Sequence, residues 1–124
     1  MAHTYYWEPE GLYRKFFDEV SGEEILASNL EIQNQPEFLK IKYIINDFSD
    51  VSSYTVTQGH TEIYAKTDDI ISDTKGKLAI AIVVLNEEPK AFAENYRQQL
   101  KNSFFTCEIF ESLQEAREWV NKQS

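Results

Sequence analysis

Glycine, proline and cysteine are scarce in this chain. Four Gly and three Pro are scattered along 124 residues without forming a flexible or proline-rich linker, so we expect a single domain over residues 1–124. Cys107 is the only cysteine, and no disulfide can form within the chain. A free cysteine fits a reducing compartment, and residues 1–10 lack the basic and apolar segments of a secretory signal. We therefore expect a cytoplasmic protein.

Basic residues and long apolar runs are also few. Twelve Lys and Arg stand against 21 Asp and Glu, which gives a net charge of −9. An acidic chain without a basic cluster repels phosphate backbones and anionic lipid, so we expect no nucleic-acid partner. The longest apolar run, residues 78–85, is far shorter than the roughly 20 residues of a membrane-spanning helix, so we expect no integral membrane segment. Solubility is the simplest explanation of the acidic charge.

The sequence motifs of common catalytic and metal sites are missing as well. The chain has neither a glycine-rich phosphate loop nor a G-x-S-x-G motif. Its two histidines are His3, near the N-terminus, and His60, on the apolar side of a predicted helix. For His60 a satisfied, half-buried histidine is favoured over a metal ligand. Cys107 lies between Phe105 and Ile109 in a predicted strand, which favours a buried thiol with a raised pKa over a nucleophile. We expect no enzyme activity, cofactor or metal.

Apolar residues, by contrast, are sufficient for a folded core, since the chain is 42% hydrophobic and 14% aromatic. Alternating apolar residues predict strands, and the unbroken apolar run predicts a central strand covered on both faces. The predicted strands are residues 4–8, 12–19, 39–48, 77–85 and 104–110, and the predicted helices are 21–33, 52–73, 86–102 and 112–122. The order β-β-α-β-α-β-α-β-α predicts an α/β fold with a mixed, mostly parallel five-stranded sheet and four helices.

Side-chain spacing predicts how the helices begin and which faces pack on the sheet. Ser21 with Glu24, and Ser112 with Glu115, have the spacing of a capping box, and Asn86 is a predicted cap. Apolar residues at helical spacing predict the buried face. The predicted inward residues are Ile25, Leu26 and Leu30 in the first helix, and Val56, His60, Ile63, Thr67 and Ile70 in the second.

One polar segment, residues 46–53, follows the predicted third strand and opens the predicted helix at 52–73. Functional groups of open α/β sheets gather at the carboxyl ends of parallel strands. A helix N-terminus there favours negative charge, including a phosphate on serine. Ordinary helix capping by Ser, Asp and Asn is the alternative explanation. The side chains that we predict to form a partner-binding site are Asn46, Asp47, Ser49, Asp50, Ser52 and Ser53.

Three parts of the sequence carry a family resemblance. They are residues 43–49, the apolar residues 79–84, and the closing residues Ile109, Phe110, Ser112, Glu115, Ala116 and Trp119. With the order of the elements, they resemble the SpoIIAA-like branch of the STAS domains, small regulatory domains named for sulfate transporters and anti-sigma-factor antagonists. The resemblance covers nearly the whole chain and rests on element order and hydrophobic pattern.

The resemblance implies a non-enzymatic regulatory domain that contacts a protein partner at the loop after the third strand. In anti-sigma-factor antagonists, a serine at the start of the following helix is phosphorylated by a partner kinase, in a pattern close to Asp-Ser-Ser-Gly. Ser52 and Ser53 hold that place here as candidate phosphorylation sites, although no glycine follows them. The resemblance also implies carriage of nonpolar ligands with reversible membrane association.

Two functions therefore stay open from the sequence. The first is a cytoplasmic regulatory domain that acts through protein–protein contact, in which the partner is another protein or a second copy in a homodimer. The alternative is a carrier of a small nonpolar, lipid-like ligand with peripheral membrane association. The many aromatic residues are compatible with the alternative, although aromatic residues more often form only the core.

Overall fold

The computed structural model describes residues 2–100 and 104–123. Its five-stranded sheet has the strand order β1-β2-β3-β4-β5, with β1 antiparallel to β2 and all other pairs parallel. The strands are β1 (His3–Trp7), β2 (Gly11–Ser21), β3 (Tyr43–Thr55), β4 (Leu78–Val83) and β5 (Phe105–Phe110). The helices are α1 (Gly22–Gln33), α2 (Gln58–Lys75), α3 (Glu87–Gln99) and α4 (Leu113–Lys122), with a short 3-10 helix at Pro36–Lys40. The predicted fold class and order of elements are confirmed.

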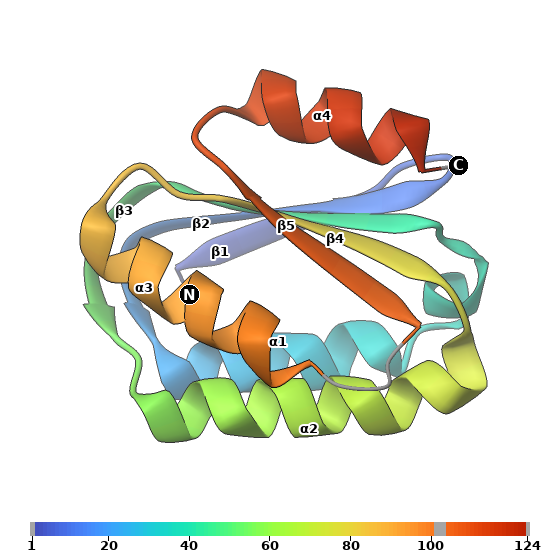
Figure 1. Cartoon of the computed structure of the whole chain (residues 1–124), viewed down its shortest axis with the longest axis horizontal. Coiled ribbons are helices and arrows are strands. Elements are labelled where there is room, and N and C mark those ends of the chain that lie inside the picture. Colours follow the sequence, from blue (N-terminus) through green and yellow to red (C-terminus); the bar gives the residue numbers. More distant parts are fainter. Residues whose placement is uncertain (1, 101–103, 124) are drawn as a thin grey trace.

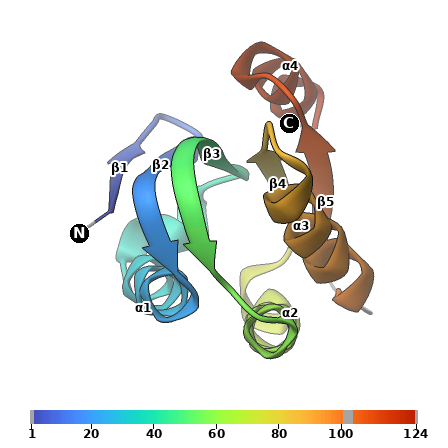
Figure 2. The same ribbon diagram turned by 90° about the vertical axis from the view of Figure 1, so that its left-hand side faces the viewer.

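The helices divide unequally between the two faces of the sheet. Each parallel strand is added beside the previous one in the same direction, so right-handed crossovers place α1, α2 and α3 together on one face. Helix α4 lies alone on the other face, against β4 and its neighbours (Figures 1 and 2). Under α4 lies a small apolar cluster of Ile45, Ala81, Val83, Ala116 and Val120, separate from the larger core beneath the other three helices.

Every residue of β4 is buried, which confirms that this apolar strand is covered on both faces. The prediction that it is the central strand is wrong, however, because β3 is the middle strand and β4 lies between β3 and β5. A strand next to the edge is covered on both faces here because α3 and α4 both extend over the β4–β5 side of the sheet (Figure 2).

The prediction for residues 39–55 needs the largest correction. The strand does not begin at Leu39, since Pro36–Lys40 forms a 3-10 helix. It begins at Tyr43 and runs on to Thr55, through the residues predicted to form a loop and the first turn of a helix. Two partners on β2 stabilise the polar residues in the strand: Arg14 donates to Asn46, and Tyr13 donates to Asp47. Side-chain pairing across strands thus overrides the turn preference of Asn and Asp.

Helix α2 therefore begins at Gln58 rather than Ser52, and its buried face differs from the predicted one. The residues that point inward are Thr61, Tyr64, Ala65, Asp68 and Ser72. Ile63 is 46% exposed and Ile70 is 73% exposed, although both were predicted to pack on the sheet. In α1, likewise, Leu30 is largely exposed while Ser28 and Ile32 are buried. Polar residues therefore point inward where the apolar pattern alone predicts isoleucine and leucine.

The helix caps are confirmed in two of three cases. The hydroxyls of Ser21 and Ser112 accept from the backbone N–H groups of Glu24 and Glu115, each at 3.1 Å. Asn86 precedes α3 but makes no capping hydrogen bond through its side chain among the residues described. The predicted end of α3 at residue 102 lies outside the described residues, and the described helix ends at Gln99.

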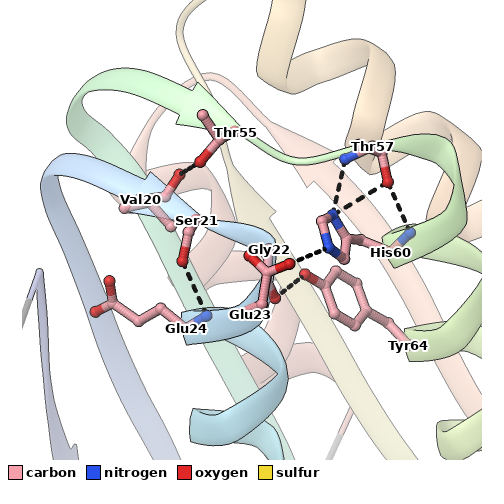
Figure 3. A network of polar contacts seen from close by, with 9 residues as sticks. All are labelled: Val20, Ser21, Gly22, Glu23, Glu24, Thr55, Thr57, His60 and Tyr64. Atoms are coloured by element: carbon pink, nitrogen blue, oxygen red, sulfur yellow. Dashed lines mark hydrogen bonds and ion pairs between the residues drawn. The ribbon is translucent and has the colours of Figure 1, made fainter.

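The beginnings of α1 and α2 lie side by side and are joined by a polar network (Figure 3). His60 Nδ1 accepts from the backbone N–H of Thr57, so Nε2 carries the proton and donates to Glu23 at 2.9 Å. Tyr64 donates to the carbonyl of Gly22 at 2.6 Å. His60 is thus a satisfied, half-buried histidine, as predicted. The network fixes α1 against α2 at the end of the sheet where β2 and β3 finish.

Strand β3 extends beyond the end of β4. Tyr43 to Asp47 pair with Ala79 to Val83, where β4 ends, and the rest of β3, to Thr55, lies beside β2 alone. This outer part of β3 and the end of β2 run side by side toward the beginnings of α1 and α2 (Figure 2). Side chains from β3, β4 and the three helices on this face surround a cavity. None of the helices in the described ranges combines the length and apolar character needed to cross a bilayer.

Candidate binding cavity

A cavity of about 100 Å³ lies between the sheet and α1, α2 and α3. Most of its wall is apolar, with Ile44 from β3, Ile80 and Ile82 from β4, and Phe105 from β5. Its lining also includes three partly exposed aromatic residues, Phe48, Tyr54 and Phe92, here called the aromatic rim; Phe48 and Tyr54 lie on the part of β3 that extends beyond β4. The cavity thus lies over the body of the sheet, between the parallel strands and the three helices that cover this face, and combines an apolar wall with a few polar groups as ligand-binding cavities commonly do.

Arg14 is the main basic group of the cavity. It is only 4% exposed and comes from the middle of β2, on the face that α1, α2 and α3 cover. Its Nε donates to Asn46 Oδ1 at 2.9 Å, and its Nη1 donates to Ser28 Oγ at 3.0 Å. Its guanidinium lies over the ring of Phe16, 5.0 Å from the centroid. Burial lowers the pKa of Arg14 to about 10, so the group stays charged at neutral pH.

Asp68 supplies the opposite charge from α2. It is 7% exposed, and its two carboxylate oxygens accept from Tyr96 and from Gln33, the latter at 3.0 Å. Burial raises the pKa of Asp68 to about 6, and the two hydrogen bonds and the charge of Arg14 only partly oppose that rise. Among the described residues no ion pair joins Arg14 to Asp68 directly, although both line the cavity. The cavity therefore combines an apolar wall with two separated buried charges.

Searches for known relatives leave the family open. No protein-family model matches the chain, and no curated protein matches its sequence. A five-stranded mixed sheet with an antiparallel first pair and parallel strands after it is consistent with the SpoIIAA-like resemblance, but it does not identify that family. The function must therefore be argued from the site itself.

The residues predicted as a contact site lie in strand β3, so they do not form one surface. Asn46 alone lines the cavity. Asp47 is buried on the opposite face, where it accepts from Tyr13 and from Ser49, each at 2.6 Å. Asp50 pairs with Lys15 at 2.7 Å. The six residues therefore divide between two faces of the sheet.

The two candidate phosphorylation sites are exposed, as a modified serine requires, but they do not lie at a helix N-terminus. Ser52 donates to the carbonyl of Asp18 at 3.1 Å, and Ser53 is paired with Glu19 across β2 and β3. Helix α2 begins only at Gln58. The dipole of α2 therefore does not favour a phosphate at Ser52 or Ser53.

Sequence reasoning missed three of the polar side chains that line the cavity: Arg14, Asp68 and Tyr96. One signal was available for Arg14, because Leu12, Arg14 and Phe16 share one face of an alternating strand and two of the three are apolar. A charged residue in that pattern predicts a buried charge with a specific partner. No such signal marked Asp68, because the apolar pattern of its helix predicts a buried face that does not include it.

Two other chemically reactive side chains, Cys107 and His3, are buried and packed against neighbouring residues. Cys107 is 7% exposed and, as predicted, shares a buried face with Phe105; burial raises the pKa of the thiol to about 12. His3 lies 2.6 Å from Glu24 and packs against Phe16. In residues 2–100 and 104–123, no three His, Cys, Asp or Glu side chains are grouped to hold a metal ion.

Proposed function

We propose that this chain is a non-enzymatic binding domain that holds a small, mostly apolar molecule in the cavity beneath α1, α2 and α3. The observation that carries the proposal is an apolar cavity that contains a buried guanidinium and a buried carboxylate without a direct ion pair between them. Binding sites for small molecules have this composition, with an apolar wall and a few fixed polar groups that orient the ligand.

The energetics of the two charges support a role in binding. Burying an ionised group costs several kcal/mol, and an apolar pair of the same volume is often as stable or more stable. Asp68 illustrates the cost, because its pKa is raised although Arg14 attracts the ionised form. Strongly perturbed titratable groups in a cleft mark functional sites more often than ordinary core positions.

The SpoIIAA-like resemblance favours the same function, since it implies carriage of nonpolar ligands, and we propose a carrier of that kind in the cytoplasm. A resident ligand would leave the cavity by the aromatic rim of Phe48, Tyr54 and Phe92, because these side chains are partly exposed. Peripheral attachment to a membrane would bring that rim close to the lipid from which such a ligand is taken.

The proposal is tested by filling the cavity. Toluene and hexanol are titrated into the native protein, and amide NMR shifts are followed. We expect saturable shifts at residues around the cavity, and loss of those shifts in Ala93→Leu, because Ala93 is buried in the lining and a larger side chain occupies the space. The matched control is Ala91→Leu, on the exposed side of α3. Absence of saturable binding by the wild type would refute the proposal, as would equal binding by Ala93→Leu.

A protein contact at the end of β3 is the second candidate function. Its support is that Asp50, Ser52 and Ser53 are exposed on residues 48–55, which have a strand neighbour on one side only. A partner protein, or a second copy of the chain, would bind there and would be released by phosphorylation of either serine. Pull-down with wild type, Ser53→Asp and the distant Arg97→Glu tests this. Equal recovery of partners by wild type and Ser53→Asp, with loss in Arg97→Glu, would place the contact elsewhere.

A further inference from the structure

We infer that the ligand of this cavity carries a carboxylate and that Arg14 Nη2 binds it. This inference rests on the proposed binding function and specifies the chemistry of the ligand. It follows from which polar atoms around the cavity are already engaged and which are not.

The hydrogen-bonding capacity of Arg14 is only partly used. Nε donates to Asn46 and Nη1 donates to Ser28, whereas Nη2 donates to no atom of the residues that the structure describes. In a planar guanidinium, the N–H groups of Nε and Nη2 point to the same side, so the free donor lies next to Asn46. A buried cation with an unused N–H that lines a cavity is a binding group for an anionic oxygen.

Asn46 adds a second donor beside the first. Because Arg14 can only donate, the side-chain oxygen of Asn46 must face it, and the NH2 group of the amide therefore points away from Arg14. Asn46 lines the cavity, and no hydrogen bond from its NH2 group is found within residues 2–100 and 104–123. Arg14 and Asn46 together thus offer two free donors among the side chains that line the cavity, and a carboxylate has two oxygens that can accept from them.

Several acceptors around the cavity are, in contrast, already engaged. The two oxygens of Asp68 accept from Gln33 and Tyr96, and the hydroxyl of Thr61 accepts from Asn95 at 2.7 Å. A ligand with acceptor atoms and a negative charge leaves these bonds intact and supplies the direct ion pair that Arg14 does not make with any of the described residues.

The remaining volume sets the size of the ligand. Liquid water occupies about 30 Å³ per molecule, so a cavity of about 100 Å³ holds a carboxylate and a short hydrocarbon segment. The hydrocarbon segment would contact Ile44, Ile80 and Ile82, and a longer tail would continue toward the aromatic rim. The chemical class is therefore a small carboxylate with an apolar body.

The decisive experiment uses the wild-type protein and three probes with one alkyl chain: hexanoate, hexanol and hexylammonium. Binding is measured at neutral pH by amide NMR shifts. We expect hexanoate to bind roughly tenfold more tightly than hexanol, the gain of a charge-assisted hydrogen bond, and hexylammonium to bind more weakly than hexanol. No variant has to fold for this comparison. If hexanol binds as tightly as hexanoate, the binding function stands and the carboxylate site is refuted; if none of the probes binds, both are refuted.

A charge variant gives an independent test. Asp68→Asn removes the negative charge that shares the cavity with the bound carboxylate, and we expect it to tighten hexanoate binding by roughly tenfold, a larger gain than for hexanol, because only hexanoate is charged. The matched control is Asp73→Asn, which makes the same charge change on the exposed side of α2. Unchanged hexanoate affinity in Asp68→Asn, or an equal gain in Asp73→Asn, would overturn the placement of the carboxylate at Arg14.

Discussion

The cost of burying Asp68 predicts that removing its charge stabilises the protein. The pKa of Asp68 is raised from 3.8 to about 6 in the folded protein, which therefore binds the proton more tightly than the unfolded chain does. Stability then falls as the pH rises through the window between the two values, and the loss is complete above about pH 6. A pKa that is higher by about two corresponds to a loss of about 3 kcal/mol in the free energy of unfolding. In Asp68→Asn this loss disappears.

The substitution keeps the hydrogen bonds of the site. Tyr96 can still donate to the oxygen of the new amide, and Gln33 can rotate its own amide to accept from the new NH2 group. Below about pH 4 the neutral aspartic acid and the amide are nearly equivalent, so the two proteins should have similar unfolding free energies. At neutral pH the variant should be more stable by about 3 kcal/mol.

The assay is urea unfolding of wild type and Asp68→Asn at a series of pH values from about 4 to about 8. Taking the difference between the two proteins cancels the contributions of all other carboxylates, including Glu8 and Glu23, whose pKa values are lowered. Asp73→Asn serves as the control for a change of net charge. A difference that does not vary with pH, or a variant less stable than wild type at neutral pH, would refute the claim that burial outweighs the attraction of Arg14.

Three further predictions concern the fold. Gly22→Ala should destabilise the protein by about 1–3 kcal/mol in urea unfolding, because a β-carbon at Gly22 overlaps the ring of His60; unchanged stability would mean that the ring moves aside freely. Cys107 should react with a thiol reagent slowly in the native protein and rapidly once it is unfolded, and equal rates would contradict its burial. Ile70→Gln should change the unfolding free energy by less than about 0.5 kcal/mol, whereas a loss typical of a core residue would show that the exposed face of α2 is misplaced.

The parts of the fold that the sequence predicts are those where one physical signal acts alone. The unbroken apolar run of β4 is hidden from water only if helices cover both faces of the strand. The serines before α1 and α4 each cap a helix through their hydroxyl groups. The order of elements then follows from alternation. These signals are local, and the packing of the elements against one another does not change the structure that they predict.

The errors arise where long-range partners override local preference. Asn46 and Asp47 favour turns in isolation, but Arg14 and Tyr13 stand opposite them on β2 and keep them in a strand. The helical periodicity of apolar residues predicts that Ile63 and Ile70 point inward. Asp68 points inward instead, because it has hydrogen-bond partners on α1 and α3 that the periodicity does not reveal. The candidate binding site depends on the same long-range partners, so the site itself was the least predictable part.

Strand order that equals chain order has a consequence for how this molecule is made. Each new strand joins the edge of a sheet that already exists, and no segment must be inserted between two earlier ones. The sheet can thus grow in the direction of synthesis, with the hairpin of β1 and β2 as its start. Helix α4 is made after the last strand, and until it docks, Ile45, Ala81 and Val83 face water on an uncovered surface. During that interval the nascent chain is most exposed to aggregation, and a chaperone that binds apolar strands would find its target there.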